Sequence, residues 1–406
     1  MNDKKEGIEP DNDDGVRSIW NKSFILLILV SLITAMSFNM VYVVISKYAL
    51  EVTSSLSIAG VIAGTFSIAA LIIRPFAGAT ADTVNKKKLF IFANALITIA
   101  LFGYTLSGNV ATLFFFRVLH GVAFGISGTV NIALVTQYIP KGRIGEGIGF
   151  YGLGQVMAQI ISPNLGVYIE AHYGFQTLFL IVTGLSLVGV LLLTTLKYTE
   201  EIKRKVHLKK KFTIKSFVAT EVIVYAIVGG LFSYSNGIVS SFLVLVGEER
   251  NIENVGLFFS VAAIVLFVLR LFVGKLADKK GLTVVVSISL IAAAISMTLI
   301  GFASTLGILL VAAIFKSIGQ GGGQISLQAE CIKRVDPARV GVATSTFYIG
   351  ADLGQGFGPM IGGAISSVFN YTTLYVFSAG LMLVVMFLFI LYQKRDSRTP
   401  SNLNAQ

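Results

Sequence analysis

Ionisable side chains inside long apolar segments are the residues whose types could do chemistry in this sequence. Arg117 and His120 stand together in one such segment, while Lys316 and Asp352 each lie about ten residues from the end of another. A charge inside a membrane is costly and therefore faces a wet cavity or another polar group. At 1.5 Å per residue, Lys316 and Asp352 both lie about 15 Å deep, near the middle of a bilayer core about 30 Å thick.

Proton binding is the chemistry that these residue types favour. Burial favours the neutral form of a carboxyl group and a nearby cation favours the ionised form, so Asp352 beside Lys316 or Arg117 is our first candidate for proton coupling. Glu221 and His120 are the next candidates. No spacing of His, Cys, Asp and Glu indicates a metal site, and no nucleophile–base arrangement predicts an enzyme.

A polar stripe is expected along the helix that holds Lys316. Lys316, Gln320, Gln324 and Gln328 recur every four residues and so share one face. This stripe is typical of a substrate-binding surface, with polar contacts between helices as the alternative. The residues predicted to line the substrate cavity are Arg117, Lys316, Gln320, Gln324, Asn39, Asn236, Tyr42, Tyr151 and Phe347.

The elements that position these residues are predicted to be membrane helices. Hydrophobic residues make up 54% of the 406 residues and charged residues only 13%, where about a quarter is usual in a soluble protein. Apolar stretches of roughly 20 residues match the length of a membrane-spanning helix. The sequence predicts an all-α membrane protein with twelve transmembrane helices, at about 24–45, 56–79, 88–107, 111–137, 146–169, 175–196, 218–245, 254–275, 282–302, 306–330, 342–365 and 372–392.

The distribution of positive charge predicts the orientation. Most Lys and Arg fall in the termini and in the loops on the same side, while Lys47 and Arg250 are the ones expected in loops of the other side. By the positive-inside rule, both termini are cytoplasmic. This bias accounts for the formal net charge of +11, so the lipid bilayer is the expected partner and nucleic acid is not.

An internal repeat divides the chain into two halves. The stretch from Arg74 to Asp82 reappears from Arg270 to Asp278, 196 residues later, and the same offset carries Pro163 onto Pro359. A run of Lys and Arg between the halves marks the longest loop. The predicted organisation is a cytoplasmic tail at 1–22, a six-helix bundle at 23–196, a cytoplasmic basic linker at 197–216, a second six-helix bundle at 217–392 and a cytoplasmic tail at 393–406.

The loop after the second helix resembles a signature of the major facilitator superfamily, and the resemblance covers nearly the whole chain. Gly78, Asp82, Asn85, Lys86 and Lys87 follow the family pattern, with Asn85 in place of a glycine. Asparagine tolerates the left-handed backbone that glycine adopts there. The resemblance implies two pseudo-symmetric six-helix bundles and a cytoplasmic gate, made of Gly78, Asp82, Arg74, Gly274, Asp278 and Arg270.

Two further motifs resemble family signatures in the fourth and fifth helices. Arg117, His120 and Gly121 follow the family's R-x-x-[QH]-G pattern. The fifth helix is similar to a glycine-rich pattern associated with proton-driven antiporters, although ordinary packing of small residues explains it too. The residues of this packing motif and of its repeat in the eleventh helix are Gly149, Ser162, Pro163, Gly166, Gly358, Pro359 and Gly362.

The sequence thus predicts a secondary transporter without cofactors, resembling bacterial drug and metabolite exporters of the cytoplasmic membrane. A glycine pattern at Gly147, Gly149 and Gly152 has no preceding strand and does not indicate a dinucleotide site, and no motif predicts ATP binding. We expect efflux of a small organic molecule, a drug or a metabolite, in exchange for protons or sodium ions, by alternating access. The alternatives are an uptake symporter or facilitator for an anionic metabolite, and a sensor on the same fold.

Overall fold

The computed structural model describes residues 19–140, 143–198, 218–270, 272–336 and 339–396. Every regular element in these ranges is a helix. The first half contains α1 (Lys22–Thr53), α2 (Leu56–Thr83), α3 (Lys86–Thr105), α4 (Val110–Val135) with the short helix η1 (Thr136–Tyr138), and α5 (Ile144–Thr194). The second half contains η4 (Thr220–Val222), α6 (Ile223–Glu249), α7 (Leu257–Arg270), α8 (Val273–Lys280), α9 (Leu282–Gly301), α10 (Leu306–Gly319), η5 (Gln320–Gln324), α11 (Ile325–Lys333), α12 (Val340–Val368) and α13 (Tyr371–Asp396).

These elements account for the twelve predicted passes. Nine helices of the described chain are long and apolar enough to cross a membrane. One of them, within α5, is long enough for two passes and breaks at Gly174, whose φ of +81° suits a residue without a Cβ. The remaining passes are the apolar α7 with α8, and the glycine-containing α12 of 29 residues.

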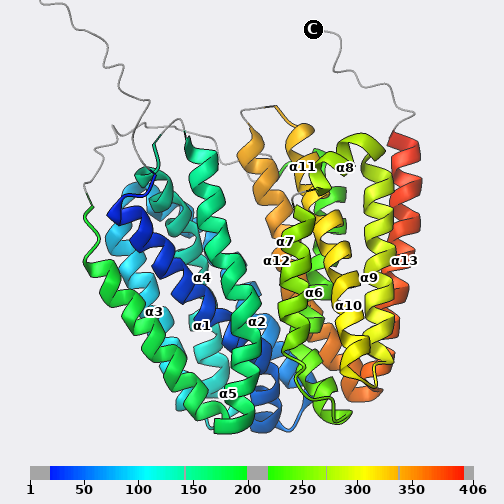
Figure 1. Cartoon of the computed structure of the whole chain (residues 1–406), viewed down its shortest axis with the longest axis horizontal. Coiled ribbons are helices and arrows are strands. Elements are labelled where there is room, and N and C mark those ends of the chain that lie inside the picture. The colour runs from blue at the N-terminus through cyan, green and yellow to red at the C-terminus, as the bar shows by residue number, and fades with distance from the viewer. Residues whose placement is uncertain (1–18, 141–142, 199–217, 271, 337–338, 397–406) are drawn as a thin grey trace, which may run out of the picture.

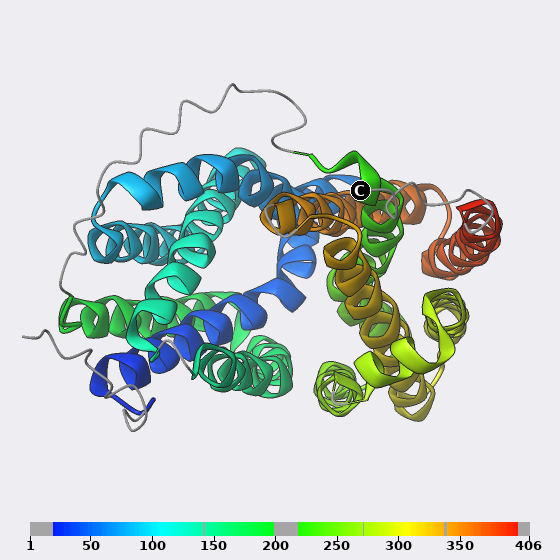
Figure 2. The ribbon, with the colours of Figure 1, turned by 90° about the horizontal axis from the view of Figure 1, so that it is seen from above.

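The helices form two bundles that lie side by side (Figures 1 and 2). We call the end where α1 begins and α13 ends the terminal face, and the end where α1 finishes at Thr53 the far face. Across the boundary, α2 packs against α12, α5 against α7 and α1 against α6. The two halves of the sequence thus meet mainly along these three helix pairs.

The contacts between α2 and α12 depend on glycines of both helices. A Cβ atom at Gly64 would lie 2.0 Å from the carbonyl oxygen of Gly356, and one at Gly60 would lie 2.2 Å from that of Pro359. No side chain fits at such a distance, so the two backbones pack directly. On the other side of the seam, the Ser260 hydroxyl donates to the Ile160 carbonyl at 2.5 Å.

Two local expectations were wrong. The first helix extends to Thr53 rather than ending near residue 45, so Lys47 lies within α1 and not in a loop. Asn85 has a φ of −61° rather than a left-handed one, because its side-chain oxygen caps α3 by accepting from the Lys88 N–H at 3.0 Å. Its counterpart Gly281 does adopt a positive φ, +82°.

Candidate functional site

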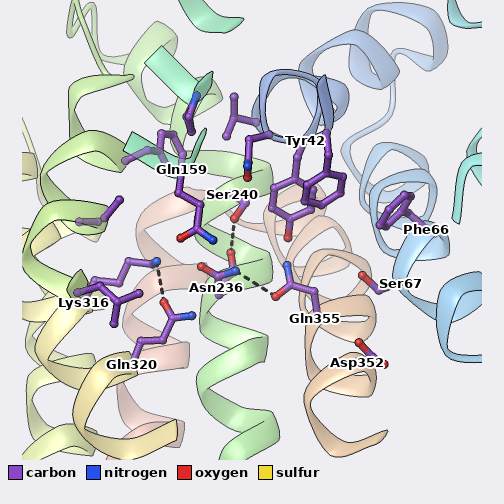
Figure 3. Close-up of a pocket in the computed structure, with 18 of the residues that line it drawn as sticks. Tyr42, Phe66, Ser67, Gln159, Asn236, Ser240, Lys316, Gln320, Asp352 and Gln355 are labelled. Carbon is purple, nitrogen blue, oxygen red and sulfur yellow. Dashed lines mark hydrogen bonds between the residues drawn. The ribbon is translucent and has the colours of Figure 1, made fainter. Parts of the chain in front are cut away.

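A cavity of about 290 Å³ lies between the two halves, lined by residues of α1, α2, α4, α5, α6, α7, α10, α12 and η5 (Figure 3). Its size is close to the lower end of the range for small-molecule sites, about 300–1,000 Å³. The residues that were predicted for the cavity or for proton coupling and that do line it are Asn39, Tyr42, Asn236, Lys316, Gln320 and Asp352.

One wall of the cavity is a chain of hydrogen-bonded polar side chains from α10 and η5. The Lys316 ammonium donates to Gln320 Oε1 at 3.0 Å, and the Gln320 amide donates in turn to Gln324 Oε1 at 3.4 Å. The Gln324 amide then donates to Ser233 Oγ at 3.1 Å. Gln324 does not line the cavity itself but holds Gln320 in place. Three members of the predicted stripe, Lys316, Gln320 and Gln324, therefore form an ordered network that ends at the cavity. The fourth, Gln328, donates to the Tyr348 hydroxyl at 3.1 Å and does not line the cavity.

The helix turn that carries this network is wider than an α-helical turn. Residues Gln320–Gln324 form a π-helical segment containing the buried glycines Gly321, Gly322 and Gly323. Such wide turns are rare and are frequent at functional sites. A Cβ atom at Gly323 would lie 2.2 Å from the ring of Phe232, so the absence of a side chain lets η5 pack against α6.

Amide groups of α6 and α12 lie between the Lys316 wall and Asp352. The Asn236 amide donates to Gln355 Oε1 at 3.1 Å, and the Ser240 hydroxyl donates to the Asn236 carbonyl at 2.6 Å (Figure 3). Gln355 is one helical turn from Asp352 on α12. Both hydrogen-bond donors and acceptors therefore face the cavity from the second half.

The first half contributes aromatic rings together with the polar side chains of Asn39, Ser67, Arg74 and Gln159. The Phe38 ring stacks at a centroid distance of 5.0 Å from Tyr42, 5.2 Å from Phe66 and 4.7 Å from Phe124. All four rings line the cavity. We call Phe38, Tyr42, Phe66 and Phe124 the aromatic wall. The cavity thus combines an aromatic wall from the first half with amide groups from both halves.

Asp352 forms an ion pair across the boundary between the halves, but not with the expected partner. Its carboxylate accepts from Arg74 Nη1, so α12 of the second half is joined to α2 of the first. We expected Lys316 or Arg117 to be this partner, and that pairing is wrong because Lys316 lies on the opposite side of the cavity (Figure 3). Arg74 was expected in the cytoplasmic gate, and it lines the cavity.

Arg117 lies behind the aromatic wall and does not line the cavity. Its side chain is fully buried, with the guanidinium carbon 4.6 Å from the centroid of Phe66. Nη2 donates to the Ala63 carbonyl at 3.3 Å, while Nε and Nη1 have no hydrogen-bond partner among the described residues. This cation therefore contacts a ring of the cavity lining but not the cavity itself.

His120 is also enclosed within the first half. Its Nδ1 lies 3.0 Å from the Tyr104 hydroxyl, and its ring meets Phe66 edge-on at 5.0 Å. The ring is 1% exposed and does not line the cavity with Asp352. The geometry is that of a packed, hydrogen-bonded histidine.

Tyr151 and Phe347 do not line the cavity, contrary to the prediction. The Tyr151 hydroxyl accepts from the Asn131 amide at 2.8 Å and lies inside the first half. Phe347 is buried within the second half, against Gly229. Both side chains are packing residues, because aromatic residues of membrane helices pack as readily against neighbouring helices as against a cavity.

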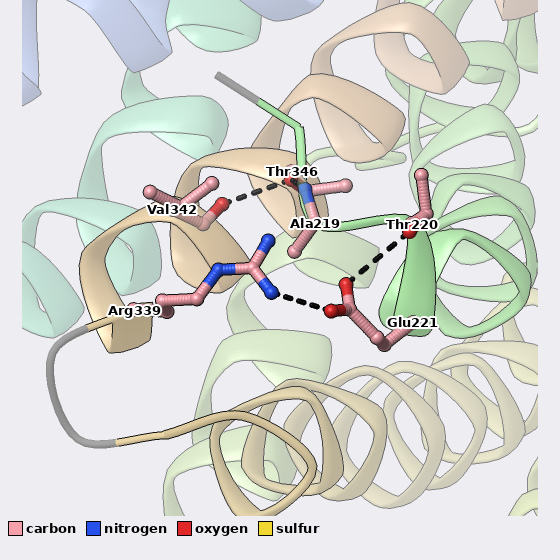
Figure 4. Close-up of polar contacts among 6 residues, drawn as sticks. All are labelled: Ala219, Thr220, Glu221, Arg339, Val342 and Thr346. Carbon is pink, nitrogen blue, oxygen red and sulfur yellow. Dashed lines mark hydrogen bonds and ion pairs between the residues drawn. The ribbon is translucent and has the colours of Figure 1, made fainter. Parts of the chain in front are cut away.

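Glu221 lies in a different place from the other proton-coupling candidates. It stands in η4 at the start of α6, where Arg339, the N-cap residue of α12, donates to its carboxylate and the Thr220 hydroxyl donates to the other carboxylate oxygen at 3.4 Å (Figure 4). The Glu221 side chain is 44% exposed and does not line the cavity. It joins two helices of the same half.

The predicted cytoplasmic gate is described only in part. Arg270 is exposed at the end of α7. The side chains of Asp82 and Asp278, and the surroundings of Gly78 and Gly274, lie outside the residues that the structure describes. The role of this gate stays a prediction.

The small residues of the packing motif lie where helices approach each other. A Cβ atom at Gly166 would lie 2.7 Å from the Met40 carbonyl oxygen, and one at Gly358 would lie 2.6 Å from that of Tyr234. Gly362 meets the ring of Phe242 in the same way. Of the other members, Pro163 lines the cavity, Pro359 meets Gly60, Ser162 is fully buried and Gly149 lies outside the described side chains.

A second ion-pair cluster near the far face was not predicted. Lys47 of α1 donates to Glu170 of α5 at 2.6 Å and also pairs with Glu248 of α6. Glu170 belongs to the first half and Glu248 to the second, so the lysine bridges the halves. We call Lys47, Glu170 and Glu248 the far-face cluster. Because the sequence placed Lys47 in a loop, it gave no reason to look for partners on other helices.

Sequence patterns also missed most of the aromatic wall. Phe38 and Tyr42 are four residues apart on α1, a spacing that places two rings on one face, and this signal was available. Phe66 and Phe124 come from α2 and α4, and only the packing of three helices brings them to Phe38. Gln355 was also predictable as a cavity residue, because it lies one helical turn after Asp352 and so shares its face of the helix.

Comparison with known proteins agrees with this architecture. The sequence profile described as Major Facilitator Superfamily matches residues 27–282 and 225–406. The chain belongs to the Major Facilitator Superfamily. Among solved structures, its fold is similar to that of the nucleoside transporter NupG (TM-score 0.76, 16% identity, 91% of this chain and 99% of that one) and to that of the peptide transporter POT in complex with sulfate (TM-score 0.77, 14% identity, 93% and 96%).

Several proteins of similar sequence are bacterial. The multi-drug resistance efflux pump PmrA of Streptococcus pneumoniae is 25% identical over 83% of this chain and 86% of its own length. The multidrug resistance protein MdtG of Citrobacter koseri is 23% identical over 77% and 79%. An uncharacterized transporter of this superfamily from Bacillus subtilis, YuxJ, is 26% identical over 79% and 86%. The chain is thus a multi-pass secondary transporter and not an enzyme.

Proposed function

We propose that this transporter exports a small organic molecule from the bacterial cytoplasm in exchange for protons, by alternating access of its two halves. The observation that carries the proposal is the ion pair between Asp352 and Arg74, which faces the cavity and joins the halves. A group that binds both a proton and the opposite half links protonation to the arrangement of the bundles. Asp352 is therefore the proposed coupling residue.

The coupling step follows from the charge of the carboxyl group. Ionised Asp352 attracts Arg74, and protonated Asp352 has no charge with which to hold it. Proton binding thus removes an attraction between α12 and α2. A ligand shifts a conformational equilibrium only by its difference in affinity for the two states. The proton meets this condition if the pair is intact in one state and broken in the other.

The contacts of the seam support alternating access. The far-face cluster and the approach of Gly64 to Gly356 hold the halves together in the part of the seam nearer the far face. The terminal face carries exposed basic residues, including Lys88, Lys279 and Lys394, as expected for a cytoplasmic side. We infer that the conformation is closed to the outside, with both termini in the cytoplasm.

Export is favoured over uptake by the relatives, because PmrA and MdtG are named as an efflux pump and a multidrug resistance protein. Uptake of an anionic metabolite is the second candidate, and the presence of Lys316 in the cavity favours it. Protons are favoured over sodium because Asp352 is a single carboxylate already paired with an arginine, whereas a metal cation takes several oxygen ligands.

Transport in sealed vesicles with an imposed pH gradient tests the proposal. We expect inside-out vesicles with an acidic lumen to accumulate a small organic probe above its external concentration, with 2-naphthoate and ethidium offered separately as an anion and a cation. Asp352→Asn should abolish this uphill accumulation while sparing exchange down a substrate gradient. Asp336→Asn is the matched control, because Asp336 is exposed in the turn before α12, away from the cavity.

The alternatives give different results. Accumulation only in right-side-out vesicles identifies an uptake system. Accumulation that depends on a sodium gradient identifies sodium, and not the proton, as the coupling ion. If the Arg74→Met/Asp352→Leu double variant still pumps against a gradient, the ion pair is structural and the coupling proposal is wrong. Removing both partners of a buried pair is often nearly neutral for folding, so this variant is expected to fold.

A further inference from the structure

The charges that face the cavity do not balance. Arg74, Lys316 and Asp352 are the ionisable acidic and basic residues among its described lining. Arg74 and Asp352 neutralise each other as an ion pair. No described carboxylate lies within ion-pair distance of Lys316, whose partner is the neutral Gln320. One positive charge is left over inside the membrane-spanning part of the protein.

Lys316 retains hydrogen-bonding capacity toward the cavity. An ammonium group has three N–H donors, and Gln320 accepts one of them. The amide chain from Gln320 to Gln324 and Ser233 presents its oxygens toward the lysine and its N–H groups away from it. This orientation matches a charged ammonium at the end of the chain. A buried cation with only neutral partners is costly, and an anionic group on a ligand supplies the missing counter-charge.

The opposite side of the cavity offers ring faces backed by a second cation. Aromatic pairs stack at centroid distances of about 4.5–7 Å, the range seen among Phe38, Phe66 and Phe124. Arg117 lies directly behind Phe66, with two of its nitrogens unpaired in the described structure. Positive charge therefore lies on both sides of the space, which disfavours a cationic ligand.

We propose that the transported molecule is a planar aromatic anion of one or two rings, such as an arene carboxylate or sulfonate. Its ring packs against the aromatic wall and its anionic group pairs with Lys316. The amides of Asn236 and Gln355 lie between these two contacts and bind polar substituents. The cavity volume of about 290 Å³ limits the ligand to one or two rings. This assignment rests on the proposed function, since it takes the cavity to be the substrate site.

Direct binding to the purified, full-length protein tests this assignment without any gradient. Four probes separate charge from ring: 2-naphthoate, the cation 2-naphthylmethylammonium, the neutral 2-naphthalenemethanol and the saturated anion decahydro-2-naphthoate. Equilibrium dialysis in detergent gives the Kd of each. We expect 2-naphthoate to bind at least ten-fold more tightly than the cation and at least three-fold more tightly than the saturated anion.

Substitutions assign the selectivity to its residues. Lys316→Met should weaken 2-naphthoate binding about ten-fold and leave the neutral alcohol unchanged, whereas Lys316→Arg should keep the preference for the anion. Phe38→Leu should remove the advantage of the aromatic over the saturated anion. Lys333→Met is the matched control, because Lys333 is exposed at the end of α11 and does not line the cavity. It should bind all four probes like the unmodified protein.

The proposal is overturned if the unmodified protein binds the cation as tightly as 2-naphthoate, or binds no probe. It is also overturned if Lys316→Met retains the preference for the anion. The probe comparison needs no variant, so a folding defect in Lys316→Met does not remove the test. Failure of the proposed function looks different: an aromatic anion that binds through Lys316 but is not moved uphill by a pH gradient refutes proton-coupled export and leaves the binding site intact.

Discussion

Glu248→Gln is the substitution that isolates the bridge between the halves at the far face. It removes the charge that Lys47 meets on the second half and keeps the pair of Lys47 with Glu170 inside the first half. Lys47→Met is a poorer choice, because it leaves Glu170, whose side chain is 7% exposed, without its partner. We expect Glu248→Gln to shift the transporter toward the state that is open at the far face.

The size of the shift follows from charge separation and exposure. Two unit charges about 4 Å apart attract each other by roughly 4 kcal/mol at an effective dielectric constant of about 20. The Glu248 side chain is 47% exposed, so water screens the pair and leaves a net contribution of about 0.5–1 kcal/mol. Since about 1.4 kcal/mol corresponds to a tenfold change in an equilibrium constant, we expect a change of about two- to five-fold.

Distances between spin labels on the two halves measure this shift. Cysteines at Gly108 and Ser304 place one label on each half in exposed turns of the far face, in a chain whose native Cys331 is replaced by alanine. A Cβ atom at Gly108 meets nothing within 4 Å, so the label position is tolerated. Double electron–electron resonance should show a larger long-distance population in Glu248→Gln.

The neighbouring residue provides the control for this experiment. Glu249 is also exposed at the end of α6 and is not part of the far-face cluster, so Glu249→Gln removes the same charge from the same region. An unchanged distance distribution in Glu248→Gln refutes the reasoning. An equal shift in Glu249→Gln also refutes it, because the loss of any surface charge in this region would then explain the effect.

Three further predictions concern other parts of the molecule. Gly64→Ala should destabilise the protein by about 1–3 kcal/mol in thermal unfolding, since its Cβ meets a backbone oxygen of α12. Gly184→Ala is the control, because a Cβ atom there meets nothing within 4 Å and should leave the stability unchanged. Equal melting temperatures of the two variants contradict the close packing of α2 and α12. Glu221→Gln should leave pH-driven transport unchanged, because its exposed ion pair lies outside the cavity; loss of coupling there moves the proton site to η4. A cysteine at Lys88 should react with impermeant reagents only from the cytoplasm and one at Gly108 only from outside, and reversed labelling overturns the orientation.

The number of helices and the division into halves were predictable from sequence, because the bilayer sets the length of each apolar stretch and the repeat is visible at one offset. The place of Asp352 near the middle of its helix was predictable for the same reason. Its partner was not, because depth gives the height of a residue and not its direction around the bundle. Lys316 and Arg74 both stand within membrane helices, and only the packing of α2 against α12 selects Arg74.

Ends of helices were less predictable than their middles. Lys47 belongs to α1 because the helix continues past the residue where hydropathy falls, and the partners of its ammonium come from α5 and α6. Asn85 follows a family pattern in position but serves as a helix cap, which asparagine does well with its side-chain oxygen. Both differences arise from polar contacts near the ends of helices.

The wide turn at Gln320–Gln324 has a consequence for how the cavity changes in evolution. Each residue of an α-helix turns the chain by about 100°, whereas a π-helical turn accommodates one extra residue between aligned positions. Deleting one glycine from Gly321–Gly323 restores an α-helical turn, so α10 with Lys316 and α11 keep their own neighbours while Gln320 changes its position relative to Gln324. A single codon lost or gained here thus offers a short mutational route from one substrate preference to another.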